Sequence, residues 1–131
     1  MRTTRRRMLV LAFAAGFLAV GIPYWSIPCD SPAFSLPSAL PDAGLVVVGC
    51  MAALARVLSP AGLVRTTLAA GASVPAAVMA RVVYEVVPDP TSHNLWPFEL
   101  ALAVVPGFGP ALAGAVAGGL AARLSRTPGG D

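Results

Sequence analysis

The stretch RRRMLVLAFAAGFLAVGIPYW, residues 5–25, decides the fold class, because an arginine cluster is followed directly by a long apolar run. At a helical rise of about 1.5 Å per residue, the run from Met8 onward covers most of a hydrocarbon core of about 30 Å. It closes with Tyr24 and Trp25, aromatic side chains that are typical of a membrane–water interface. We therefore expect a first transmembrane helix over residues 8–25.

The same stretch has a second interpretation, a secretory signal peptide that is cleaved off. Cleavage sites follow small residues in an A-x-A-like pattern, whereas residues 21–28 read GIPYWSIP and are bulky and aromatic. The sequence TRRRML at residues 4–9 loosely resembles a twin-arginine export signal, but such a cluster before a first helix is more commonly a cytoplasmic anchor. We favour a retained helix and keep cleavage as the alternative.

The composition of the whole chain agrees with a membrane protein. Hydrophobic residues make up 56% of the 131 residues and charged residues only 11%, whereas soluble domains have about 45–50% apolar and about 25% charged residues. In lipid, a helical bundle can pair all of its own backbone groups. We predict an all-α integral membrane protein, one domain over residues 1–131 that forms a four-transmembrane-helix bundle.

Three further apolar segments follow the first helix. The predicted spans are 8–25, 43–58, 66–87 and 97–124, joined by loops 26–42, 59–65 and 88–96. The second span is short, and Arg56 in its last turn can extend toward water and lengthen it. Pro75 interrupts the third span. The fourth exceeds the length of about 20 residues that a span needs, so Pro106 and Pro110 mark where it should bend or break.

The charged residues predict the orientation, because arginine and lysine concentrate in the cytoplasmic loops of membrane proteins. With the N-terminus inside, the cytoplasmic side holds Arg2, Arg5, Arg6, Arg7, Arg56, Arg65, Arg123 and Arg126, and the external side holds Asp30, Asp42, Glu85, Asp89 and Glu99. Only Arg81 departs from this N-in/C-in pattern. All nine basic residues are arginine, which together with abundant alanine, glycine and proline indicates a high-GC bacterial gene. We assign the chain to the bacterial cytoplasmic (inner) membrane as a multi-pass protein.

Polar side chains gather at the predicted outer end of the third and fourth helices. This candidate cluster consists of Arg81, Glu85, Asp89, His93 and Glu99. Arg81 is the strongest member, since ionisable groups within a membrane are costly and often functional. It lies one helical turn from Glu85, so the pair either faces a polar cavity or forms an intrahelical ion pair that reaches the outer interface. We favour the ion pair.

A lone histidine near carboxylates could bind a metal or transfer protons. His93 has no second histidine to accompany it, and the spacing matches no metal motif, so we predict no metal site and favour a capped turn before the fourth helix. No catalytic constellation, phosphate loop or dinucleotide motif is found either, which favours a non-enzyme without a cofactor. The formal charge of +3 comes from arginines at the ends of apolar segments, so nucleic-acid binding is set aside.

Small residues in the fourth span predict close helix packing. Gly114 and Gly118 form a G-x-x-x-G pattern, which would pack against another helix of the bundle or, in a sharper version, form a homodimer seam. Cys29 falls in an external loop and Cys50 in an apolar span, so the two are predicted to be unpaired thiols, one of them a small core residue.

These features do not specify a biochemical activity. The leading hypothesis is a non-enzymatic accessory or structural membrane subunit that contacts the lipid bilayer and packs against itself, as a homo-oligomer, or against a larger membrane complex. The alternative is a small oligomeric transporter or channel that uses Arg81, Glu85 and the prolines near mid-membrane, because broken helices at matching depth expose backbone groups in some transporters. Prolines are also ordinary in membrane helices, which favours the first hypothesis.

Overall fold

A computed structural model of the chain describes residues 2–28, 40–59, 61–88, 91 and 95–126. Within these ranges the regular structure is entirely α-helical, which confirms the predicted all-α class. The helices are α1 (Arg2–Trp25), α2 (Asp42–Leu58), α3 (Leu63–Gly71), α4 (Ser73–Val86) and α5 (Trp96–Leu124).

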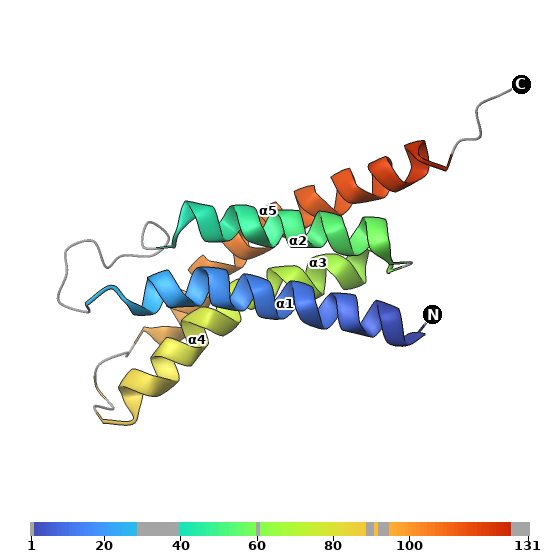
Figure 1. The fold of residues 1–131 in the computed structure, drawn as a ribbon. Coiled ribbons are helices and arrows are strands. Elements are labelled where there is room, and N and C mark those ends of the chain that lie inside the picture. The colour runs from blue at the N-terminus through green and yellow to red at the C-terminus, as the bar shows by residue number, and fades with distance from the viewer. Residues whose placement is uncertain (1, 29–39, 60, 89–90, 92–94, 127–131) are drawn as a thin grey trace, which may run out of the picture.

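The helices form an antiparallel bundle in which α3 and α4 follow one another in the same direction and together run the length of the bundle once (Figure 1). α5 packs against α2, α3 and α4, while α1 packs against α2, α3 and α4 from another side. At one end of the bundle α1 and α3 begin and α2 and α5 finish; at the other end α1 and α4 finish and α2 and α5 begin. The first is called the arginine end below and the second the carboxylate end.

Three of these crossings are long and apolar enough to span a membrane. They are α1, the combined α3–α4 element over Leu63–Val86, and α5. α2 is shorter, with 17 residues, which at about 1.5 Å per residue gives about 25 Å. Length and composition therefore support three of the four predicted spans directly.

The interruption between α3 and α4 is a single residue, Ala72. The chain still makes helix-type bonds across it, because the Ala72 N–H donates to the Leu68 carbonyl at 3.0 Å and the Ala76 N–H donates to the Ala72 carbonyl at 3.1 Å. Pro75 follows three residues later and has no N–H to donate to the carbonyl of Gly71, one turn earlier. The interruption thus lies within one turn of the predicted site.

α5, in contrast, is not broken at Pro106 or Pro110, since both lie inside one continuous helix. The predicted break is therefore absent, and the residues that directly follow the two prolines pack against neighbouring helices. A Cβ atom at Gly107 would lie 2.7 Å from the Gly71 carbonyl oxygen, and Ala111 is fully buried. These contacts hold the helix against α3 and α4 although each proline removes one backbone hydrogen bond.

Small side chains fill the interior and large apolar ones cover the exterior. Among the described residues, nine alanines are at most 1% exposed, namely Ala12, Ala52, Ala55, Ala61, Ala70, Ala77, Ala103, Ala111 and Ala115. Leu11 is 54% exposed and Val105 76% exposed. Water-soluble proteins avoid large contiguous apolar surfaces, whereas helices in lipid pack through small residues and direct large ones outward.

The closest approach between helices joins α5 to α2. A Cβ atom at Gly114 would collide with the Gly49 carbonyl, and one at Gly118 would collide with the backbone of Ala53. The predicted G-x-x-x-G face is therefore covered by α2 of the same chain, which leaves no room for a helix of a second copy at these residues.

Cys50 is exposed on α2, so its prediction as a core residue is wrong. The buried face of α2 consists of Gly44, Val48, Ala52 and Ala55, and Cys50 lies on a different side of the helix. Cys29, the other predicted free thiol, lies outside the described residues.

Candidate functional site at the carboxylate end

The charged residues of the bundle are sorted by the helix ends on which they lie, and Figure 1 shows which helix ends share each end of the bundle. The arginine end carries Arg2, Arg5, Arg6, Arg7, Arg56, Arg65, Arg123 and Arg126, while the carboxylate end carries the described Asp42, Glu85 and Glu99. Asp42 and Glu99 lie in the first turns of α2 and α5, where a negative charge complements the helix dipole. Arg81 is again the exception, near the carboxylate end of α4.

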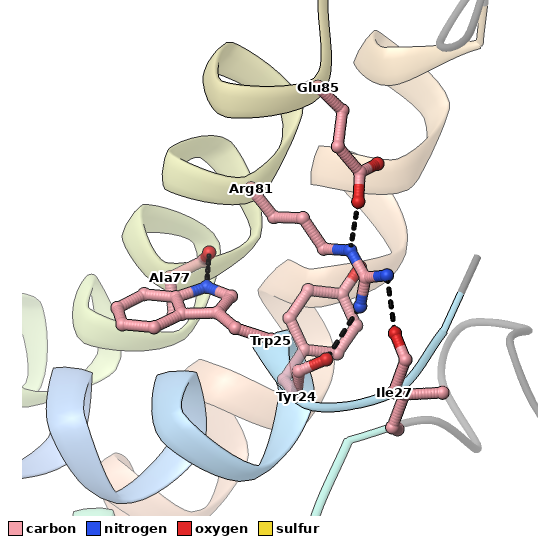
Figure 2. Close-up of polar contacts among 6 residues, drawn as sticks. All are labelled: Tyr24, Trp25, Ile27, Ala77, Arg81 and Glu85. Atoms are coloured by element: carbon pink, nitrogen blue, oxygen red, sulfur yellow. Dashed lines mark hydrogen bonds and ion pairs between the residues drawn. The ribbon is translucent and has the colours of Figure 1, made fainter.

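The Arg81 guanidinium is held by three acceptors of its own chain (Figure 2). Its Nε donates to Glu85 Oε1 at 2.7 Å, its Nη1 donates to the Tyr24 carbonyl at 2.6 Å, and its Nη2 donates to the Ile27 carbonyl at 2.6 Å. The side chain is 5% exposed and that of Glu85 17%. Arg81 therefore points into the contact between α4 and α1.

The acceptors on α1 exist because that helix ends abruptly. The helix ends at Trp25, and Pro28 has no N–H to donate to the Tyr24 carbonyl one turn earlier, so the backbone donor of that carbonyl is the Ile27 N–H at 3.4 Å. A cation at a helix C-terminus also complements the dipole. The Arg81 guanidinium lies 5.0 Å from the centre of the Tyr24 ring, which adds a cation–π contact. Arg81 thus acts as a C-terminal cap supplied to α1 by α4.

A second bridge between the same helices runs in the opposite direction. The indole Nε1 of Trp25, on α1, donates to the carbonyl of Ala77 on α4 at 2.9 Å. Ala77 lies one turn before Arg81, and Figure 2 shows the two bridges next to each other. The Trp25 ring also packs edge-on against Phe17, with ring centres 5.3 Å apart. The carboxylate end of α4 is therefore fastened to α1 at two successive turns.

The ion pair between Arg81 and Glu85 joins two residues that are four apart on one face of α4. The structure differs from the sequence interpretation in one respect, because Arg81 does not extend toward the interface. It turns inward, toward the carbonyls of Tyr24 and Ile27. The signal for this partnership was present in the two prolines that frame the end of α1, but the sequence alone does not show which arginine reaches them.

A cavity of about 340 Å³ lies beside this cluster. It is lined by Trp25, Ala80, Arg81, Tyr84 and Glu85. Tyr84 is 80% exposed, so the cavity borders the outer surface of α4. The site can hold an apolar group next to a charged pair, and its charged atoms already have partners in the chain.

The remaining members of the predicted cluster are only partly placed. Glu99 is partly buried at the start of α5, and its N–H donates to the Leu95 carbonyl at 3.1 Å. Asp89 and His93 lie outside the described residues. Within the described ranges, no group of three His, Cys, Asp or Glu side chains is close enough to hold a metal ion.

The arginine end contains a feature that the sequence interpretation missed. Arg56 was expected to extend into water, but its Nε donates to the Ala115 carbonyl on α5 at 3.3 Å and its Nη1 donates to the Ala61 carbonyl. Arg56 therefore connects α2 to α5 and to the turn before α3, beside a second cavity of about 220 Å³.

A comparison of the chain with known protein families, curated proteins and solved structures found no match.

Proposed function

We propose that the chain is an integral membrane protein with four spans. Three crossings have the required length and composition, and the argument for α2 comes from its neighbours. α2 packs along both α1 and α5, and its exposed side chains include Val46 and Leu54. A bundle embedded through α1 and α5 would carry α2 into the lipid with them. Arg56 and Asp42 at its two ends would then lie at the two headgroup layers.

We further propose that the N-terminus and the C-terminus both lie in the cytoplasm, at the arginine end of the bundle. The positive-inside rule supports this orientation, because eight arginines share the arginine end and the described carboxylates share the other. The exclusive use of arginine among the nine basic residues, with abundant alanine, glycine and proline, supports the proposal that this membrane is the bacterial cytoplasmic (inner) membrane.

Within that membrane, the proposed role is that of a non-enzymatic accessory or structural subunit. The observation that carries this proposal is the engagement of Arg81, the costly charged residue within a span, by the carbonyls of α1. The Arg81 N–H groups hold α4 against the end of α1, and a substrate that binds Arg81 would have to break these hydrogen bonds. Gly114 and Gly118 of α5 are likewise used inside the chain, against α2. What the bundle offers to a neighbour is a surface of large apolar side chains.

This proposal is tested by photo-crosslinking in native membranes. A photoreactive residue at Val105, which is 76% exposed on α5, should crosslink to one defined protein in a fixed stoichiometry. The same residue at Ala103, which is fully buried on that helix, is the matched control and should give crosslinks within the chain. Recovery of the chain alone from the Val105 variant, and from equivalent variants on the other helices, would contradict the accessory role.

The alternative is a small oligomeric transporter or channel. The observation that favours it is the cavity of about 340 Å³ beside Arg81 and Glu85. Reconstituted protein in liposomes should then move a solute, and Glu85→Gln should abolish movement while the protein stays folded. Glu99→Gln at the same end of the bundle is the control. Solute movement that depends on Glu85 would support the transport function and contradict the accessory role. If no solute moves, the transport alternative is wrong.

A further inference from the structure

The cavity at the arginine end is built from three separate parts of the chain. The end of α2, the turn before α3 and the last turns of α5 line a half-open cavity of about 220 Å³. The lining residues are Arg56, Ser59, Ala61, Gly62, Gly119, Ala122, Arg123 and Arg126. Three of them are arginines and none is a carboxylate, so the cavity is strongly electropositive.

Arg56 is fixed in the wall of this cavity. Its Nε and Nη1 are bonded to the carbonyls of Ala115 and Ala61, and its Nη2 lies over Gly119, where a Cβ atom would come within 2.7 Å. A guanidinium has five N–H donors, and Nη2 makes no hydrogen bond within the described part of the chain. Arg56 is therefore oriented before any ligand arrives, with donors remaining.

Rigid guanidinium groups recognise carboxylates and phosphates through paired hydrogen bonds. The volume of about 220 Å³ equals about seven water molecules at about 30 Å³ each, which suits a phosphate group better than a whole nucleotide. Ser59, 5% exposed, adds a polar atom at the wall, although its hydroxyl donates to the Ala55 carbonyl at 2.6 Å.

The surroundings of the cavity indicate where the phosphate comes from. Val57 and Leu58 at the end of α2 are 42% and 57% exposed, and Leu120 and Leu124 on α5 are 54% and 76% exposed. A charged cavity next to exposed apolar side chains matches a lipid, whose headgroup is anionic and whose chains are apolar. Basic pockets between transmembrane helices bind such headgroups in other membrane proteins.

We infer that this cavity binds the phosphate of an anionic membrane phospholipid, with Arg56 and Arg126 as direct ligands and the acyl chains lying along α2 and α5. The inference does not depend on the proposed accessory role, but it rests on the proposed insertion of α2 and α5 into the membrane.

The test measures lipid binding to the full chain in a neutral detergent, by native mass spectrometry with phosphatidylglycerol or phosphatidylcholine added. The anionic lipid should bind more tightly. Arg126→Gln should weaken its binding by about fivefold, the effect of one basic residue near a headgroup. Arg65→Gln removes an exposed arginine from the same end of the bundle without touching the cavity, and it should change binding by less than about twofold.

A second pair of variants tests whether lipid binding depends on the space inside the cavity as well as on its charge. Ala122→Leu fills the cavity without altering the net charge and should abolish the preference for the anionic lipid, whereas Ala121→Leu, on the neighbouring exposed position, should keep it. Equal binding of both lipids, or equal effects of the two arginine variants, would overturn the inference. If inorganic phosphate at millimolar concentration displaced the lipid, the site would belong to a soluble phosphate and the lipid assignment would be wrong.

Discussion

Replacing Arg81 with glutamine should destabilise the bundle strongly, although the residue lies near one end of a helix. The substitution removes the ion pair with Glu85 and the bonds to the carbonyls of Tyr24 and Ile27. It leaves a carboxylate that is only 17% exposed without its cation and the last turn of α1 without its cap. The loss therefore combines an electrostatic effect with a backbone effect.

The structure sets limits on the size of this loss. Hydrogen bonds between membrane helices contribute about 0.6 kcal/mol each on average, and if the bond to Glu85 within α4 contributes as much as the bonds to Tyr24 and Ile27, the three give a lower value of about 2 kcal/mol. Removing one partner of a buried ion pair costs about 3–5 kcal/mol, which gives the upper value. We expect Arg81→Gln to lower the free energy of unfolding by about 2–5 kcal/mol. Glu85→Gln should cost less, because Arg81 keeps both carbonyl acceptors on α1.

Unfolding by sodium dodecyl sulfate in mixed micelles, followed by far-UV circular dichroism, measures this difference. Arg65→Gln is the matched control, since it removes an exposed arginine at the opposite end of the bundle, and it should change the free energy of unfolding by less than about 0.5 kcal/mol. An Arg81→Gln variant as stable as the Arg65→Gln variant would refute the capping role. Arg81 would then be free to serve a ligand, as in the transport alternative.

The same unfolding measurement tests three other contacts. Gly118→Ala should destabilise the chain by about 1–3 kcal/mol, because the added methyl group meets the α2 backbone, whereas Gly109→Ala, with no atom within 4 Å, should be neutral or stabilising by up to about 1 kcal/mol; the reverse order would contradict the α2–α5 packing. Trp25→Phe should cost about 0.5–1.5 kcal/mol through loss of the bond to Ala77, and an unchanged stability would show that this bridge contributes nothing. Cys50→Ala should change stability by less than about 0.5 kcal/mol, and a larger loss would mean that Cys50 packs in an interface.

The fold class could be predicted from the length of the apolar runs, and the separation of charges could be predicted from the position of the arginines relative to those runs. A run such as residues 8–25 is apolar over a membrane-sized length, and α1 runs through all of it. Arginines before or after such runs must lie at helix ends, whichever way the helices pack. Because successive helices of the bundle alternate in direction, with α3 and α4 running the same way, all eight of them lie at one end.

The partners of individual side chains could not be predicted, because they depend on which face of each helix turns inward. α5 is apolar on all sides, so its sequence has no polar stripe to mark an outer face. For the same reason Cys50 was placed in the core, and Arg56 and Arg81 were expected to extend to the interfaces. In the structure both arginines turn toward carbonyls of neighbouring helices, Ala115 for Arg56 and Tyr24 for Arg81.

The most direct test of the proposed four-span topology is a set of reporter fusions at three positions of the chain. A reporter that is active only outside the cytoplasm should be active after Ser35, inactive after Gly62 and inactive at the C-terminus after Arg126. The position after Gly62 decides the role of α2, the span with the least support from length alone. If the reporters after Ser35 and Gly62 lie on the same side of the membrane, α2 does not cross it. If the reporter after Ser35 stays cytoplasmic, the orientation is wrong.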